Sequence, residues 1–163
     1  MKRLITKTLL PTILGIAVSM ASQISVAQSL RGLKTATIVV DERSQDERNC
    51  GISSKTARTA VAFVLQQSRL RIVDNQQDGQ GFFLVGVTSI STGGESCVGV
   101  ISISLRTATQ GNTQFGKLQQ VVAVYQDGTL VAASPSSFAK IVTDAIESLT
   151  KAFVVAWADD NPL

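Results

Sequence analysis

The sequence of 163 residues contains no histidine. Histidine is the usual general base of Ser-His-Asp and Cys-His nucleophile systems, and it is a common ligand of zinc and iron in proteins. Those enzyme classes and histidine-ligated metal sites are therefore excluded. Only carboxylate or lysine chemistry remains for catalysis, and no known catalytic motif is present. We expect a protein that is not an enzyme and has no catalytic, cofactor-binding or metal-ligating residues.

Cysteine is scarce as well, with only Cys50 and Cys97. An even number of cysteines in an exported chain indicates a disulfide, and two cysteines allow one intramolecular pairing. The bond would close a loop of about 48 residues, for which the chain-entropy model gives roughly 4 kcal/mol of stabilisation. Two free thiols with a redox role are the less favoured alternative, because the sequence has no Cys-x-x-Cys motif.

The chain has no cluster of basic residues and few aromatic ones, with one Trp, one Tyr and six Phe. Three of its 15 basic residues lie near the start, at Lys2, Arg3 and Lys7, and the others balance the 12 acidic residues. Broad binding of nucleic acids or anionic membranes is therefore disfavoured. Aromatic residues that could line a sugar cleft are also few.

The N-terminus has the pattern of a secretory signal peptide, which we place at residues 1–27. A basic start precedes the apolar run Leu9–Ala21, and the small residues of Ser25–Ala27 predict cleavage between Ala27 and Gln28. An uncleaved membrane anchor is less favoured, because the run is short for about 30 Å of hydrocarbon and Pro11 interrupts it. We expect a periplasmic or secreted protein without stable membrane insertion after cleavage, and residues 28–163 as one domain.

The C-terminal stretch Ser134–Ala158 predicts a long amphipathic helix. Its apolar residues repeat in steps of three and four along one face. Ser134 is expected to cap the start, Pro135 suits the first turn, and Pro162 lies beyond the end. The apolar positions are Phe138, Ile141, Val142, Ala145, Ile146, Leu149, Ala152, Phe153, Ala156 and Trp157. Trp157 continues this stripe, so we expect it to close the core rather than to anchor a partner.

The rest of the chain alternates between strand patterns and polar connections. One further helix is predicted from Ser53 or Ser54 to about Ser68, with Phe63 widening its apolar stripe. Predicted strands are Lys34–Val40, Arg69–Asp74, Phe82–Ser91, Cys97–Thr107, Gln119–Gln126 and Thr129–Ala133. Asp127-Gly128 is a strong two-residue hairpin signal. Predicted loops and turns are Asp41–Asn49, Asn75–Gly81, Thr92–Ser96 and Ala108–Lys117.

This order predicts an α+β two-layer sandwich with one mainly antiparallel sheet of about five strands, β-α-β-β-β-β-α. Each helix has one apolar stripe, so we expect both helices on the same face of the sheet. In Cys97–Thr107, Cys97 and every second residue after it share one face, and Ser102, Ser104 and Arg106 share the other. We expect the serine- and threonine-bearing face to point outward.

Three polar features have an ordinary structural explanation that we favour. Asp41–Asn49 is interpreted as a solvated loop with internal ion pairs rather than a cation or partner site, because its spacing matches no calcium-loop pattern. The arginines of Arg69–Asp74 are expected to face water rather than hold an anion. Gly93-Gly94 is a turn and not a phosphate-binding loop, because no helix follows it.

The strand–helix start at Thr35–Leu65, the hairpin Phe83–Leu105 and the closing helix Phe138–Trp157 resemble small exported bacterial envelope proteins of unassigned function. The pattern is similar to the N-terminal domain of TolB and to LpoB- or CsgG-type accessory domains. The latter two types are lipoproteins, and this sequence lacks their lipid-bearing cysteine. The resemblance implies accessory work through protein–protein contacts, and it transfers no functional residue.

We therefore predict a non-catalytic binding or accessory protein of the cell envelope, with protein partners and no cofactor. One alternative is a secreted effector or stress protein. The other is a carboxylate-dependent, glycosidase-like hydrolase, which needs two acids converging in a cleft. The acids available to it are Asp41, Glu42, Asp46, Glu47, Asp74, Glu95 and Asp127.

Overall fold

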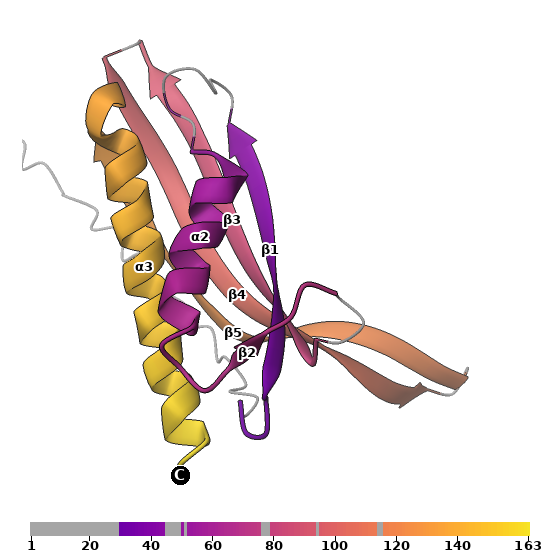
Figure 1. The fold of residues 1–163 in the computed structure, drawn as a ribbon. Helices are drawn as coiled ribbons and strands as arrows, with labels where there is room; N and C mark the ends of the chain where they lie inside the picture. Colours follow the sequence, from indigo (N-terminus) through magenta and orange to yellow (C-terminus); the bar gives the residue numbers. More distant parts are fainter. Residues whose placement is uncertain (1–29, 45–49, 51, 76–78, 94, 114–115) are drawn as a thin grey trace, which may run out of the picture.

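The computed structural model describes residues 30–44, 50, 52–75, 79–93, 95–113 and 116–163 (Figure 1). The predicted signal peptide and its cleavage site, Ala27–Gln28, lie outside the described residues. Asp46 and Glu47, from the most highly charged segment, also lie outside them.

Five strands form one sheet in the order β2-β1-β3-β4-β5. β1 is parallel to β2 and to β3, whereas β3, β4 and β5 form an antiparallel meander with longer ladders. The elements are β1 (Thr35–Ser44), α2 (Ser54–Leu65), β2 (Arg71–Ile72), β3 (Gly81–Thr92), β4 (Ser96–Thr113), β5 (Gly116–Ala133) and α3 (Pro135–Asp160). The predicted α+β arrangement and the order β-α-β-β-β-β-α are confirmed, in a mixed sheet.

The two helices lie side by side on one face of the sheet and form the second layer (Figure 1). The alternating residues that β4 was predicted to turn inward are all buried, from Cys97 to Leu105. In α3, Phe153 meets the rings of Phe83 and Tyr125 edge-on, with ring centroids 5.0 and 5.2 Å apart. The apolar stripe of α3 that the 3.6-residue period predicts therefore packs against the sheet, in the core between the helix layer and the sheet layer.

The predicted starts of the two helices hold, but one capping interaction is different. Ser53 caps α2, because its side chain accepts a hydrogen bond from the Thr56 N–H at 3.1 Å. The Ser134 side chain makes no such bond at the start of α3. Its hydroxyl is paired with the hydroxyls of Ser136 and Ser137, at 3.2 and 2.8 Å. The predicted cap function of the Ser134 side chain is therefore wrong.

The predicted end of the sheet is wrong in two places. The expected loop Ala108–Lys117 instead belongs mostly to β4 and β5, which pair as far as Thr113 and Gly116. Asp127-Gly128 is not a turn, because both residues pair with Ser102 and Ile103 in the middle of the ladder. A Cβ at Gly128 would lie 2.9 Å from the Ile101 carbonyl oxygen, so glycine allows β4 and β5 to approach closely here.

Smaller differences affect other predicted elements. β1 continues to Ser44, into the segment predicted as a loop, because it has β3 as a partner along this length. β2 has only two residues. Phe63 is 57% exposed and does not belong to the buried stripe of α2. The extent of pairing is decided by the neighbouring strand and not by the composition of the segment alone.

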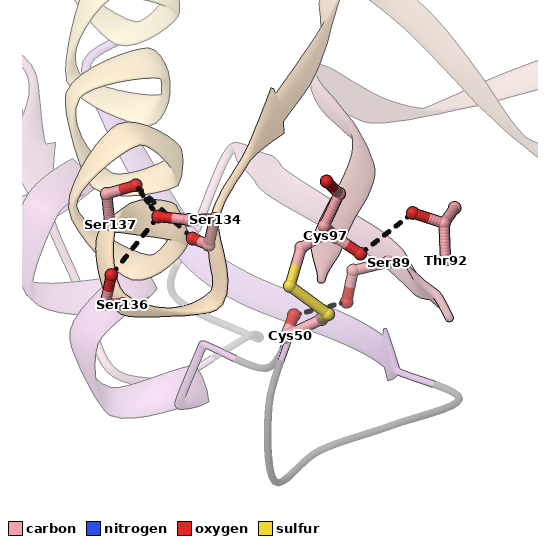
Figure 2. Close-up of a disulfide and its surroundings, with 8 residues drawn as sticks. Cys50, Ser89, Thr92, Cys97, Ser134, Ser136 and Ser137 are labelled. Atoms are coloured by element: carbon pink, nitrogen blue, oxygen red, sulfur yellow. Dashed lines mark hydrogen bonds between the residues drawn. A yellow bond between two sulfur atoms is a disulfide. The ribbon is translucent and has the colours of Figure 1, made fainter. Parts of the chain in front are cut away.

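The structure contains the disulfide that the cysteine count predicts, between Cys50 and Cys97 (Figure 2). The two Cα atoms are 5.4 Å apart, and both residues are fully buried. The Ser89 hydroxyl donates a hydrogen bond of 2.7 Å to the Cys50 carbonyl oxygen. The disulfide therefore links the segment just before α2 to the start of β4, next to the turn between β3 and β4.

Hydrogen bonds connect the C-terminal end of α3 to residues 30–33, the first described residues of the chain. The Asp160 carboxylate accepts a hydrogen bond from the Leu30 N–H, and the Asn161 amide bonds the Gly32 N–H and the Leu30 carbonyl. The Trp157 indole N–H donates to the Leu33 carbonyl at 2.9 Å. Trp157 is 5% exposed, so the prediction that it closes the core is confirmed.

We call these contacts between residues 30–33 and the end of α3 the junction at Trp157. Arg69 lies on its solvent side. Its guanidinium lies 5.4 Å from the centroid of the Trp157 ring and donates to the Asn161 carbonyl oxygen. Arg69 and Arg71 are both exposed, as predicted. Arg69 also contacts a segment more than 80 residues away, which the sequence pattern did not indicate.

Candidate interaction surface

The acids proposed for a hydrolase site are spread over the sheet. Asp41 lies in β1 opposite Gly86, and Asp127 lies in β5 opposite Ile103. Asp74 follows β2 and pairs with Arg58, while Glu95 lies in the turn between β3 and β4. Glu42 is in β1, but its side chain, like Asp46 and Glu47, lies outside the described part of the structure.

Strand spacing separates the two acids that lie within long strands. β3 and β4 stand between β1 and β5, and three spacings of about 4.8 Å give roughly 14 Å. Asp127 is paired with the buried Ile103, on the helix side, whereas Asp41 is paired with Gly86, on the outer side. In the described part of the chain, no three Cys, Asp or Glu residues gather as a group that could hold a metal ion.

The face of the sheet away from the helices is covered by no described helix or strand (Figure 1). Two cross-strand rows of this face are apolar: Ile90, Val98 and Ala132 form one, and Val100 with Leu130 forms the centre of the next. We call these five residues the outer patch. Ile90, Val100 and Leu130 are 41%, 52% and 68% exposed.

The sequence interpretation missed the outer patch because it assigned the outward face to serine and threonine. A signal was available in the run from Cys97 to Ile101, where Val98 and Val100 alternate with residues that face the core. A strand that is apolar on both faces indicates burial on both faces. Here the second face is exposed at Val100 and partly exposed at Val98 in the described structure.

The next row beside the outer patch is small and polar. Ser102 pairs with Gly86 on one side and Gly128 on the other. A Cβ at Gly86 would lie 2.7 Å from the Ser102 hydroxyl oxygen, so a larger residue there would displace the serine side chain. Because this row consists of two glycines and a serine, its side chains project less from the sheet than those of the neighbouring outer patch.

β5 is the long edge strand of the sheet. In the described structure it pairs only with β4, and beyond Arg106 the two strands leave β3 behind (Figure 1). This two-stranded extension, made of Thr107–Thr113 of β4 and Gly116–Val122 of β5, projects from the body of the protein (Figure 1); we call it the arm. A register shift between Leu105 and Arg106 marks its base, and such irregularities bend a strand.

One side chain at this edge has a perturbed protonation equilibrium. The pKa of Tyr125 is raised above its ordinary value, mainly by burial under α3 and further by the charge of Asp127 and a hydrogen bond to it. All three causes favour the neutral phenol. Tyr125 also packs on Phe153, at the boundary between the core and the open edge.

No helix within the described residues combines the length and apolar character needed to cross a membrane.

Comparison with known proteins finds similarity in structure but not in sequence. No family model matches the chain, and no curated protein matches it. Among solved structures, a dodecamer of a PelC variant from Paraburkholderia phytofirmans has 12% identity and a TM-score of 0.49, covering 78% of this chain and 90% of that one. A minor lipoprotein from Acinetobacter baumannii has 7% identity and a TM-score of 0.42, covering 79% and 94%.

Both TM-scores are below 0.5, so the resemblance to small bacterial envelope proteins that the sequence pattern indicated stays a prediction. The narrower likeness to TolB, LpoB or CsgG domains stays a hypothesis. Similarity at this level of identity and TM-score carries no argument about what this chain binds or does.

Proposed function

We propose that this chain is an exported, non-catalytic binding or accessory protein of the bacterial cell envelope, which docks a protein partner on the outer patch. The observation that carries the proposal is the exposure of Ile90, Val100 and Leu130 together on a sheet face that no described element covers. Contiguous apolar surface of this kind is typical of protein–protein contacts when polar residues surround it.

Charge and compartment support the same proposal. After removal of the predicted leader the acidic and basic residues are balanced, which favours a protein partner over a polyanion. The buried Cys50–Cys97 disulfide is consistent with an oxidising compartment such as the periplasm or the extracellular medium.

The non-catalytic part of the proposal rests on the sequence and on the distribution of acids. A glycosidase needs two carboxyl groups within about 10 Å on either side of its substrate. Asp41 and Asp127 are separated by two strands and lie on opposite faces, and Asp74, which follows β2, lies at the opposite edge of the sheet from Asp127. We therefore favour the binding protein over the hydrolase.

The proposal is tested by site-specific photocrosslinking in cells that produce the protein. A photoreactive residue at Val100 or Leu130 is expected to yield one discrete protein adduct. The matched control is the same residue at Val155, which is 62% exposed on α3, on the opposite side of the molecule. Adducts that are identical at all three positions, or absent from the sheet positions, would contradict the proposal.

Fractionation separates the envelope protein from the secreted alternative. An envelope accessory protein is expected in the periplasmic or membrane-associated fraction together with its adduct. Recovery of the mature chain mainly from the culture medium, without an adduct, would favour a secreted effector instead.

A further inference from the structure

A groove runs between β1 and the first turns of α2, on the opposite side of the molecule from β5. Its volume is about 440 Å³, and it is lined by Thr37, Ile38, Val39, Val40, Ser54, Lys55, Arg58 and Asp74. One wall is thus four consecutive residues of a strand, and the other wall is a helix surface that carries two cations.

The strand wall is an unpaired edge over most of its length. β2 pairs with β1 only at Thr35 and Ala36, and the last bond of this ladder runs from the Val73 N–H to the Ala36 carbonyl. Backbone groups of alternate residues point to the same edge of a strand, so those of Ile38 and Val40 face the groove. Within the described structure no strand bonds them.

One of these backbone groups is already bonded by a side chain. Arg58 donates to the Ile38 carbonyl oxygen at 3.1 Å and, through its other terminal nitrogen, to the Asp74 carboxylate at 3.2 Å. Asp74 is almost fully exposed, at 98%, and the Arg58 side chain is 45% exposed. An exposed ion pair of this kind contributes little, about 0–1 kcal/mol, so an incoming carboxylate can exchange with Asp74 at small cost.

The helix wall has an excess of positive charge. Lys55 lies one turn before Arg58 and makes no ion pair with any described side chain. The first turn of α2 contains no acidic residue. Among the described residues that line the groove, Lys55 and Arg58 are the two cations and Asp74 is the one acid, so these residues carry a net positive charge.

We propose that this groove binds an extended, acidic segment of a partner polypeptide, which adds a strand to the free edge of β1. Four residues of strand span roughly 13 Å, so the segment that fits has about four to five residues. Its backbone would bond Ile38 and Val40, and every second side chain would face α2. Glutamate or aspartate at those positions would meet Lys55 and Arg58, which is the β-augmentation mode of peptide recognition with charge complementarity.

The inference does not depend on the outer patch. The patch lies on β3, β4 and β5, and the groove lies at the other edge of the sheet. A Leu130→Glu variant is expected to lose the photocrosslinked adduct and still bind the peptide. Failure of one proposal therefore leaves the other intact.

The test uses the mature protein labelled with ¹⁵N and a defined probe, the acetylated and amidated pentapeptide Val-Glu-Val-Glu-Val. Saturable chemical-shift changes are expected at the amides of Ile38 and Val40 and along the first turns of α2. The sign-reversed peptide Val-Lys-Val-Lys-Val is the matched control, and it is expected to produce none. Binding should weaken as salt is raised.

Two variants decide whether the named residues are responsible. Lys55→Glu, at an exposed position, is expected to weaken peptide binding tenfold or more. Lys140→Glu makes the same charge change on the exposed surface of α3 and should leave binding within twofold. The proposal would be overturned if both peptides bound equally, or if no saturable shift appeared at Ile38 and Val40 at millimolar peptide. Shifts centred on β5, or equal effects of the two variants, would also overturn it.

Discussion

Tyr125 is the single tyrosine of the chain, so its titration can be observed without interference from others. Burial and the neighbouring Asp127 raise its pKa above the ordinary value of 10.0. The folded protein therefore holds the phenolic proton more tightly than the unfolded chain does. Its contribution to stability is fully present below pH 10 and is lost as the pH rises through the folded pKa.

We predict that near-ultraviolet titration of tyrosinate absorbance gives a higher midpoint for the folded protein than for the protein in denaturant. Asp127→Asn removes the charge but not the burial, so it should lower the midpoint only part of the way. Tyr125→Phe should reduce the fall in unfolding free energy above about pH 10. Equal midpoints for folded and denatured protein would contradict the assigned environment.

Residues differ in how far their neighbours in sequence define them. Trp157 could be placed in the core from sequence because it continues a helical apolar stripe. The partners of Arg69 could not be predicted, because the Trp157 ring and the Asn161 carbonyl come from the far end of the chain. Ser134 is an intermediate case: its position before Pro135 predicts the helix start, but neighbouring hydroxyls occupy its side chain.

At the scale of elements, the contact between β4 and α3 depends on one glycine. A Cβ at Gly99 would lie 2.8 Å from the Cζ atom of Phe138, whose ring is fully buried. The absence of a side chain at Gly99 in β4 therefore leaves room for the Phe138 ring of α3 to pack against the sheet. We expect this contact to limit how closely α3 packs against β4.

We predict that Gly99→Ala lowers the free energy of unfolding by about 1–3 kcal/mol, as overpacking typically does. In a Phe138→Leu background the same substitution should cost clearly less, because the smaller side chain leaves room. Denaturant unfolding of the four proteins gives the coupling free energy. An identical cost in both backgrounds would show that the contact does not limit the packing.

Strand ends and hairpins were predicted less accurately than helices. An amphipathic helix carries its own repeat over many turns, and α3 is found within a few residues of the predicted range. The Asp127-Gly128 pair is a local turn signal that was overridden by the long ladder with β4. A β-strand is defined by its partner, so the sequence of one strand does not determine where it continues or ends.

For the whole molecule, the disulfide is the main covalent constraint in the described structure. It closes a loop with a sequence separation of 47 residues and joins the approach to α2 to β4. We predict that the double variant Cys50→Ala/Cys97→Ala loses about 4 kcal/mol of unfolding free energy, the chain-entropy value. Unfolding of the wild type with and without reductant is the parallel measurement.

Mass spectrometry under non-reducing conditions checks the same bond directly and should find Cys50 linked to Cys97. Alkylation of both thiols without reductant in the folded, mature protein would disprove the pairing. It would also remove the support that the bond gives to an exported location.

The arm extends beyond the part of the sheet that β3 covers. From Thr107 to Thr113, β4 pairs only with β5. We predict that replacing Gln110–Gln119 by Asn-Gly, so that the Thr109–Gln120 pair closes a two-residue hairpin, changes the unfolding free energy by less than about 0.5 kcal/mol. A large loss in thermal or denaturant unfolding would show that the arm stabilises the body.

The sequence by itself determined most of the two helix faces, the inward face of β4, the single possible disulfide and the absence of histidine chemistry. These depend on composition or on a repeat within one segment, which neighbouring elements do not change. Only the tertiary structure decided the arm, the outer patch, the junction at Trp157 and the groove beside β1. Each of these depends on which strand lies next to which, and on where a strand lacks a neighbour, because pairing between distant segments sets what is buried and what stays open.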